Sequence, residues 1–133
     1  MRLMAMTRIL IADDSPPVRQ GIRNLLKAHA DWEVCGEAVD GPDAIAKTRQ
    51  LAPDVIVMDY VMPTMDGIEA ARKISSVAPT TSILLFSMYM DSQLATLARH
   101  AGISAVLSKS NAGQVVKGIE AMLRGETFRA SQI

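Results

Sequence analysis

The sequence predicts an α/β domain built on a doubly wound parallel sheet of five strands, with helices on both faces. Three observations lead to this class. A chain of 133 residues suits one domain with its own core. Short apolar runs alternate five times with apolar stripes at helical spacing. Turn-forming residues separate the two kinds of segment, and such alternation favours parallel strands joined by helical crossovers.

The strands are predicted from short runs rich in Val, Ile and Leu. Residues 55–58 are apolar without interruption, which is typical of a strand buried on both faces in a parallel sheet. Residues 32–39 alternate more loosely, as expected for a strand with one wetter face. The five predicted strands are 7–12, 32–39, 55–58, 82–86 and 104–107.

The helices are predicted from stripes at helical spacing and from the residues that bound them. Ser15 can cap the first helix, and the following prolines fit its first turn. Residues 40–43 form a turn that starts the second helix, Pro79 ends the third, and Gly102 and Gly125 end the last two. The five stripes are Val18-Ile22-Leu25-Leu26-His29, Ala44-Ile45-Thr48-Leu51, Ile68-Ala71-Ile74-Val77, Leu94-Leu97-Ala98-Ala101 and Val115-Val116-Ile119-Met122-Leu123.

Composition excludes several classes of protein. The 14 basic and 14 acidic residues balance, so net charge alone does not attract DNA or an anionic membrane. Cys35 is the only cysteine, which excludes an internal disulfide and favours a reducing compartment. The stretch 1–6 is too short for a signal peptide, and no apolar run could span a membrane. We therefore expect a cytoplasmic protein without a membrane partner.

Polar residues follow four of the predicted strands. Asp13 and Asp14 end the first, Asp59 the third, Ser87 the fourth and Lys109 the fifth. The carboxyl ends of parallel strands lie on one edge, and in the order 2-1-3-4-5 strands one and three flank the switch point. Carboxylates about 4 Å apart repel by roughly 4 kcal/mol at an effective dielectric of ~20. A hard dication such as Mg²⁺ would relieve that repulsion, and an adjacent carboxylate could then receive a phosphoryl group.

Each of these residues alone has an ordinary explanation. An Asp after a strand is usually a turn or cap residue, and a lone Lys or Ser at a strand end is usually structural. Together, at the same ends of successive strands, they favour one common site. His29, His100 and Cys35 have no second ligand at metal spacing, so we interpret them as core or surface residues.

The motifs ILIADDS, PDVIVMDYVMPTMDG, ILLFS and SKS occur in the order and spacing of the receiver domain of bacterial response regulators. The chain resembles that family from Thr7 to Gly125, and the segments 85–89 and 124–127 resemble the LuxR/FixJ-type subfamily, whose output is a helix-turn-helix domain. The resemblance implies the flavodoxin-like (βα)5 fold with strand order 2-1-3-4-5.

The resemblance also implies roles for individual residues. Asp59 would be the phosphoacceptor. Asp14 would bind Mg²⁺ directly, Asp13 largely through water, and the backbone carbonyl of Val61 would complete the protein ligands. Ser87 would be the switch hydroxyl and Lys109 would bind the phosphoryl oxygens. The donor would be a phosphohistidine on a sensor histidine kinase, or a small acyl phosphate.

Two features depart from the family pattern. Val106 stands where the family usually has a switch Tyr or Phe, and Val is too short and stiff at χ1 to swing as a ring does. Tyr89 is a possible substitute. Lys109 is followed by Ser110 in place of the common proline.

The chain is expected to comprise a receiver domain at 1–125 and a tail, or the start of a linker, at 126–133. No residues remain for an output domain, so we expect either an isolated receiver or a natural single-domain protein. DNA would be bound only through an absent carboxyl-terminal domain, and phosphorylation could produce a homodimer.

The main hypothesis is a phosphorylation-dependent switch in two-component signalling that turns over no separate substrate. One alternative is an aspartyl-phosphate phosphohydrolase, but such enzymes place a second Asp two residues after the nucleophile, where this chain has Val61. The other is an interaction module that works without phosphorylation, which the missing aromatic at position 106 makes conceivable.

Overall fold

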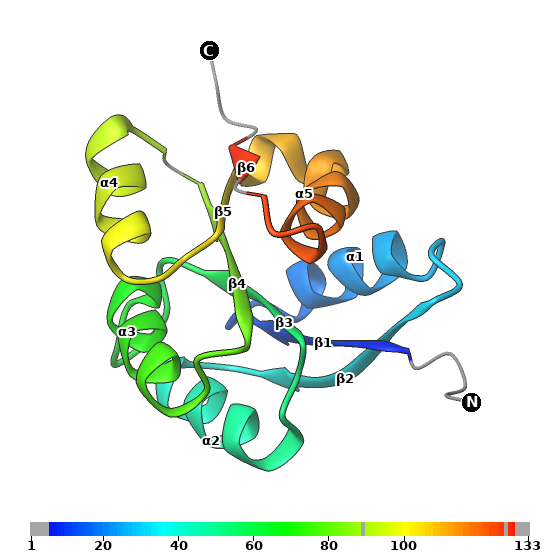
Figure 1. Cartoon of the computed structure of the whole chain (residues 1–133), viewed down its shortest axis with the longest axis horizontal. Coiled ribbons are helices and arrows are strands. Elements are labelled where there is room, and N and C mark those ends of the chain that lie inside the picture. Colours follow the sequence, from blue (N-terminus) through cyan, green and yellow to red (C-terminus); the bar gives the residue numbers. More distant parts are fainter. Residues whose placement is uncertain (1–5, 89, 127, 130–133) are drawn as a thin grey trace.

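The computed structural model describes residues 6–88, 90–126 and 128–129 of the chain, the last two by their backbone only. Its strands are all parallel and form one sheet with the order β2-β1-β3-β4-β5-β6 (Figure 1). The order 2-1-3-4-5 predicted for five strands is therefore confirmed. From β1 the chain adds β2 on one side of the sheet and β3, β4 and β5 on the other. The carboxyl ends of β1 and β3 therefore lie at the topological switch point.

The elements follow the predicted alternation closely. The strands are β1 (Thr7–Ala12), β2 (Trp32–Ala38), β3 (Val55–Asp59), β4 (Ser82–Ser87), β5 (Ala105–Ser108) and β6 (Phe128–Arg129). The helices are α1 (Pro16–Leu26), α2 (Gly41–Leu51), α3 (Gly67–Val77), α4 (Ser92–His100), the 3-10 helix η1 (Lys109–Gln114) and α5 (Val115–Leu123).

Two apolar layers sandwich the sheet. Successive side chains of a strand point to opposite faces, so Ile9 packs beneath α1 and α5, while Leu10 packs beneath α2, α3 and α4. The first layer continues through Val57 of β3 and the second through Met58. Helices on both faces explain why the central strands are apolar without alternation.

Short polar side chains start four of the helices. Ser15 accepts a hydrogen bond from the backbone N–H of Val18. Asp40, Asp66 and Asp91 accept from the N–H three residues later, each at 2.8 Å. These bonds satisfy backbone donors that have no partner inside the helix. They also fix where the chain turns from each strand end into the next helix.

The structure differs from the sequence prediction in three respects. Residues 109–114, which the sequence prediction left unassigned, form the 3-10 helix η1. The chain also pairs again with β5 through the short strand β6, inside the predicted tail. The prediction had assigned apolar stripe positions to Val77, Leu97 and Leu123, but their side chains are exposed at the helix margins. A stripe of helical period does not show how wide the covered face will be.

Candidate functional site

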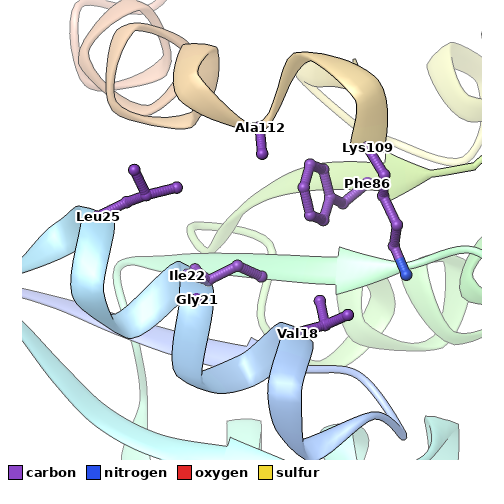
Figure 2. A pocket seen from close by; sticks show the side chains of 7 residues that line it. All are labelled: Val18, Gly21, Ile22, Leu25, Phe86, Lys109 and Ala112. Atoms are coloured by element: carbon purple, nitrogen blue, oxygen red, sulfur yellow. The ribbon is translucent and has the colours of Figure 1, made fainter.

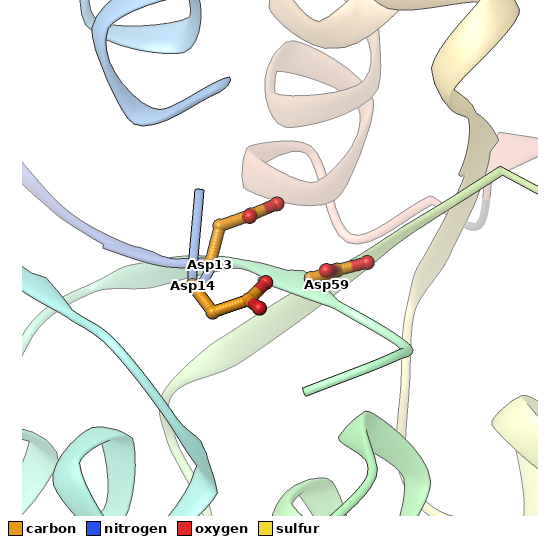
Figure 3. A group of neighbouring side chains, drawn as sticks. All are labelled: Asp13, Asp14 and Asp59. Atoms are coloured by element: carbon orange, nitrogen blue, oxygen red, sulfur yellow. The ribbon is translucent and has the colours of Figure 1, made fainter. Parts of the chain in front are cut away.

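Three carboxylates meet at the switch point. Asp13 and Asp14 follow β1, and Asp59 is the last residue of β3. One carboxylate oxygen of each lies within 4.8 Å of the others (Figure 3). Asp13 is 1% exposed and Asp59 5%, while Asp14 is exposed. The cluster is therefore open on the side of Asp14 and closed by protein below.

Lys109 supplies the nearest cation. Its Nζ lies 3.0 Å from Oδ2 of Asp13 and 3.2 Å from Oδ1 of Asp59, and its side chain is 14% exposed. The lysine directly follows β5, two strands away from Asp59 in the sheet. Its ammonium lies 5.8 Å from the ring centroid of Phe86, which spans that gap (Figure 2). Among the described residues, Lys109 is the only cation in an ion pair with these carboxylates, so the cluster carries a net negative charge.

Burial and charge shift the proton affinities in this cluster. Burial, followed by the charge of Asp13, raises the pKa of Asp59 above its ordinary value, although Lys109 and the backbone of Val61 act in the opposite direction. Burial acts to lower the pKa of Lys109, but its hydrogen bond to Asp13 and the two negative charges outweigh burial, so that pKa is raised. The lysine is therefore a permanent cation at neutral pH.

Backbone groups hold two of the acids. The N–H of Ser15 donates to Oδ1 of Asp13 at 2.8 Å, and the N–H of Val61 donates to Oδ1 of Asp59 at 3.4 Å. Val61 itself is 64% exposed at the rim of the cluster. Both buried carboxylates thus have an amide partner and the ammonium of Lys109, which offsets part of the cost of burying their charge.

The remaining predicted residues lie on the neighbouring strands. Ser87 is buried at the end of β4, one residue beyond Phe86, the register partner of Asp59. Val106 pairs with Leu85 and is buried in the core cluster that also contains Leu94 and Ala98 of α4. A valine there fills core space and cannot rotate out as a ring would. Tyr89, the possible substitute, lies outside the described residues.

A second charged network lies behind Asp13, and the sequence analysis did not identify it. Arg19 of α1 donates through Nη1 to the backbone oxygen of Asp13 at 2.7 Å and through Nε to Oε1 of Glu37 at 2.6 Å. Arg23 also binds Glu37, at 2.6 Å. In the sequence, two arginines four residues apart on a predicted helix indicate that both side chains lie on one face. The glutamate that they share is identified only by the packing of α1 on β2.

An apolar pocket of about 210 Å³ is lined in part by Lys109 (Figure 2). It lies between α1 and the 3-10 helix η1, and its lining along α1 extends from Val18 to Leu25. Its lining consists of Val18, Gly21, Ile22, Leu25, Phe86, Lys109 and Ala112. The lysine therefore joins a charged site to an apolar surface.

The loop after Asp59 is tightly folded against α3. The N–H of Gly67 donates to the backbone oxygen of Tyr60 at 2.7 Å, and a Cβ on Gly67 would collide with the backbone oxygen of Asp59. Within the same loop Thr64 has φ of +75°, a conformation unfavourable for a β-branched residue. The first residue of α3 thus packs directly against the backbone of Asp59 and Tyr60.

The donor set suits a hard dication. All the clustered groups are carboxylates, without His or Cys, which favours Mg²⁺ over a transition metal. Opposite ligands of Mg²⁺ lie about 4.2 Å apart, close to the spread of these oxygens, and the ion commonly retains water in place of some protein ligands. Asp13, Asp14 and Asp59 therefore fit such an ion.

Comparison with known proteins gives the family. Residues 9–120 match the family model of the response regulator receiver domain. The chain belongs to this family. This receiver domain is 40% identical over 122 residues to YxjL of Bacillus subtilis, described as an uncharacterised transcriptional regulatory protein, covering 91% of the chain and 56% of that protein. It is 36% identical to the transcriptional regulatory protein LiaR of the same organism, covering 96% and 61%.

Solved structures agree with the assignment. The crystal structure of a LuxR-family two-component response regulator from Aurantimonas sp. SI85-9A1 superimposes on this receiver domain with a TM-score of 0.89 at 37% identity, covering 93% of this chain and 89% of that one. The predicted likeness to LuxR-type regulators is therefore confirmed. In the described part of the receiver domain, no helix combines the length and apolar character needed to cross a bilayer.

Proposed function

We propose that this receiver domain is a phosphorylation-dependent switch of a two-component system and that Asp59 is its phosphoacceptor. The observation that carries the proposal is the buried Asp59 carboxylate at the end of β3, bound to Lys109 at 3.2 Å and grouped with Asp13 and Asp14. Asp13, Asp14, Asp59 and the backbone carbonyl of Val61 would hold Mg²⁺. When bound, the ion would neutralise charge on the carboxylates and on the phosphoryl oxygens.

The residues of the chain divide the chemistry among them. An oxygen of Asp59 forms a bond to phosphorus while the bond from phosphorus to the donor imidazole breaks, and the imidazole leaves with the electron pair. Lys109 donates to the phosphoryl oxygens. The added charge draws in the Ser87 hydroxyl, which shifts the segment 87–91 between two populated states. The face formed by α4, β5 and α5 then changes its preference for partners.

The proposal extends to partners. The donor is a phosphohistidine of a sensor histidine kinase, or a small acyl phosphate, and no separate substrate is turned over. The chain spans 56% of YxjL and 61% of LiaR, both described as transcriptional regulatory proteins. We infer that DNA is reached only through an output domain outside residues 1–125. The stretch 126–133 was expected to be a tail or the start of a linker, but Phe128–Arg129 within it form β6, which pairs with β5. Homodimerisation on phosphorylation and a cytoplasmic location belong to the same proposal.

The direct test is incubation with Mg²⁺ and a small acyl phosphate, followed by intact-mass spectrometry. We expect one phosphoryl adduct on the wild type that requires Mg²⁺. Asp59→Asn should carry none, whereas Asp54→Asn, which changes an acid at the opposite end of β3, should be labelled normally. An adduct that persists in Asp59→Asn would refute the assignment.

A further inference from the structure

Arg19 lies behind the turn that carries Asp13 and Asp14. We propose that Arg19 is a positioning residue for this acidic pair, and that Glu37 on β2 holds the arginine in place. This inference rests on the proposed function, because it concerns how the Mg²⁺-binding turn is kept in shape. The residues that touch the ion or the phosphoryl group are those already named, and Arg19 acts through Asp13.

The contact is made to the backbone rather than to a carboxylate. Nη1 of Arg19 donates to the backbone oxygen of Asp13 at 2.7 Å, and this carbonyl belongs to the peptide bond that joins Asp13 to Asp14. The N–H of Asp13 donates to the backbone oxygen of Ala38 at 3.0 Å. Both sides of Asp13 are thus anchored to β2, one directly and the other through Arg19 and Glu37.

Glu37 supplies the rigidity that an arginine lacks on its own. A free arginine side chain loses about 2 kcal/mol of rotamer entropy when it is fixed. Here Nε is bound to Glu37 at 2.6 Å, and the arginine side chain is only 14% exposed. Burial acts to raise the pKa of Glu37, but hydrogen bonds from Arg23 and Arg19 outweigh it and lower that pKa, so the glutamate is ionised at neutral pH. The planar guanidinium can satisfy both acceptors at once, which an ammonium cannot do with the same geometry.

Asp14 is the acid that depends most on this arrangement. Its side chain is exposed, and the described part of the chain supplies no hydrogen bond or ion pair to its carboxylate. Its direction is therefore set by the backbone it stands on. That backbone is the peptide whose carbonyl Arg19 holds. Loss of the contact should leave Asp14 in several orientations, of which only some face Asp59.

The test compares two arginines of the same helix. Arg19→Met removes the donors but keeps the apolar stem. Arg23→Met is the matched control, because Arg23 also binds Glu37 but, among the described residues, has no hydrogen bond or ion pair with the acidic turn. Calorimetric titration with Mg²⁺ should show binding roughly 10-fold weaker in Arg19→Met, the scale typical of residues that orient metal ligands, and changed by less than about 2-fold in Arg23→Met.

A kinetic readout separates positioning from general damage. With a small acyl phosphate, Arg19→Met should be phosphorylated slowly at low Mg²⁺ and recover toward the wild-type rate at saturating Mg²⁺. Arg19→Lys keeps the charge and one donor, so its Mg²⁺ affinity should lie between wild type and Arg19→Met. If Arg19→Met does not fold, Arg19→Lys decides the matter, and a wild-type affinity in that variant would overturn the inference.

Measurements on the wild type separate a failure of the proposed function from a failure of the role given to Arg19. If wild-type protein binds no Mg²⁺ or gains no phosphate on Asp59, the proposed function fails and takes this inference with it. If the wild type does both while Arg19→Met and Arg23→Met bind Mg²⁺ equally well, the proposed function stands. Arg19 would then be a structural residue only.

Discussion

Replacing Lys109 by Met should expose the electrostatic cost of assembling the acidic cluster. At an effective dielectric of about 20, the contacts of Nζ at 3.0 Å with Asp13 and 3.2 Å with Asp59 correspond to gross attractions of about 5.5 and 5.2 kcal/mol. The desolvation cost of the buried ammonium offsets much of this. Removing one partner of a buried ion pair typically costs 3–5 kcal/mol, and because Asp59 can take up a proton we expect about 3 kcal/mol at neutral pH.

The stability lost in Lys109→Met should depend on pH, and the titration of Asp59 determines whether it rises or falls with pH. Its pKa in the folded state is raised by burial and by Asp13, so between the unfolded and folded pKa values the native state binds more protons, and stability decreases as pH rises. Removing Lys109 takes away a charge and a hydrogen bond that lower this pKa. The pH range over which stability falls therefore extends upward in the variant, and the cost of Lys109→Met should increase as pH rises through that range.

Urea unfolding in EDTA at several pH values measures this cost, and added Mg²⁺ should restore more stability to Lys109→Met than to the wild type. The control is Lys73→Met, which removes an exposed ion pair with Glu69 at 3.7 Å and should change the free energy of unfolding by less than about 0.5 kcal/mol. Equal losses in the two variants, or a cost at Lys109 that does not vary with pH, would contradict the electrostatic account.

Three further predictions concern substitutions whose effects can be measured by unfolding or by NMR. Gly67→Ala should lose at least about 2 kcal/mol of stability, because its Cβ would collide with the backbone of Asp59, whereas Gly21→Ala, in open space within α1, should gain about 0.5–1 kcal/mol; similar effects would refute the collision. Thr64→Gly should raise stability by about 0.5–1 kcal/mol by relieving a positive φ, and a loss would show that the threonine side chain makes a compensating contact. Val106→Tyr should enlarge the NMR shift changes of α4 on phosphorylation, and identical shifts in both forms would show that the ring position does not couple the site to α4.

Much of the architecture could be predicted from the sequence, because strands covered by helices on both faces of a sheet appear as uninterrupted apolar runs. β1 was predicted with its observed bounds, since a short run rich in Ile and Leu ends directly before the acidic residue Asp13. The proximity of Asp59 and Lys109, 50 positions apart, was predictable because parallel strands end on one edge. The functional roles of these residues, by contrast, stay predictions.

Other features depend on contacts that a linear pattern does not contain. The 3-10 helix η1 has no buried residue and starts with a local bond from the N–H of Ser110 to the Ser108 hydroxyl, so it carries no apolar period. β6 has two residues, too few for an alternation to be recognised. Arg19 and Glu37 pair across α1 and β2, and their link to Asp13 requires the relative placement of three elements.

The close approach of Gly67 to the backbone of Asp59 leaves less free space on the side of Asp59 that faces α3 than a residue with a side chain would need. On that side, the N–H of Gly67 is hydrogen-bonded to the backbone oxygen of Tyr60, and there is no room for even one methyl group. The backbone of Asp59 therefore cannot move closer to α3. A displacement that starts at this carboxylate therefore has little room toward α3, and we expect it to pass toward the neighbouring strand β4. The packing of α3 thereby favours one direction for a conformational change at Asp59 before any partner is bound.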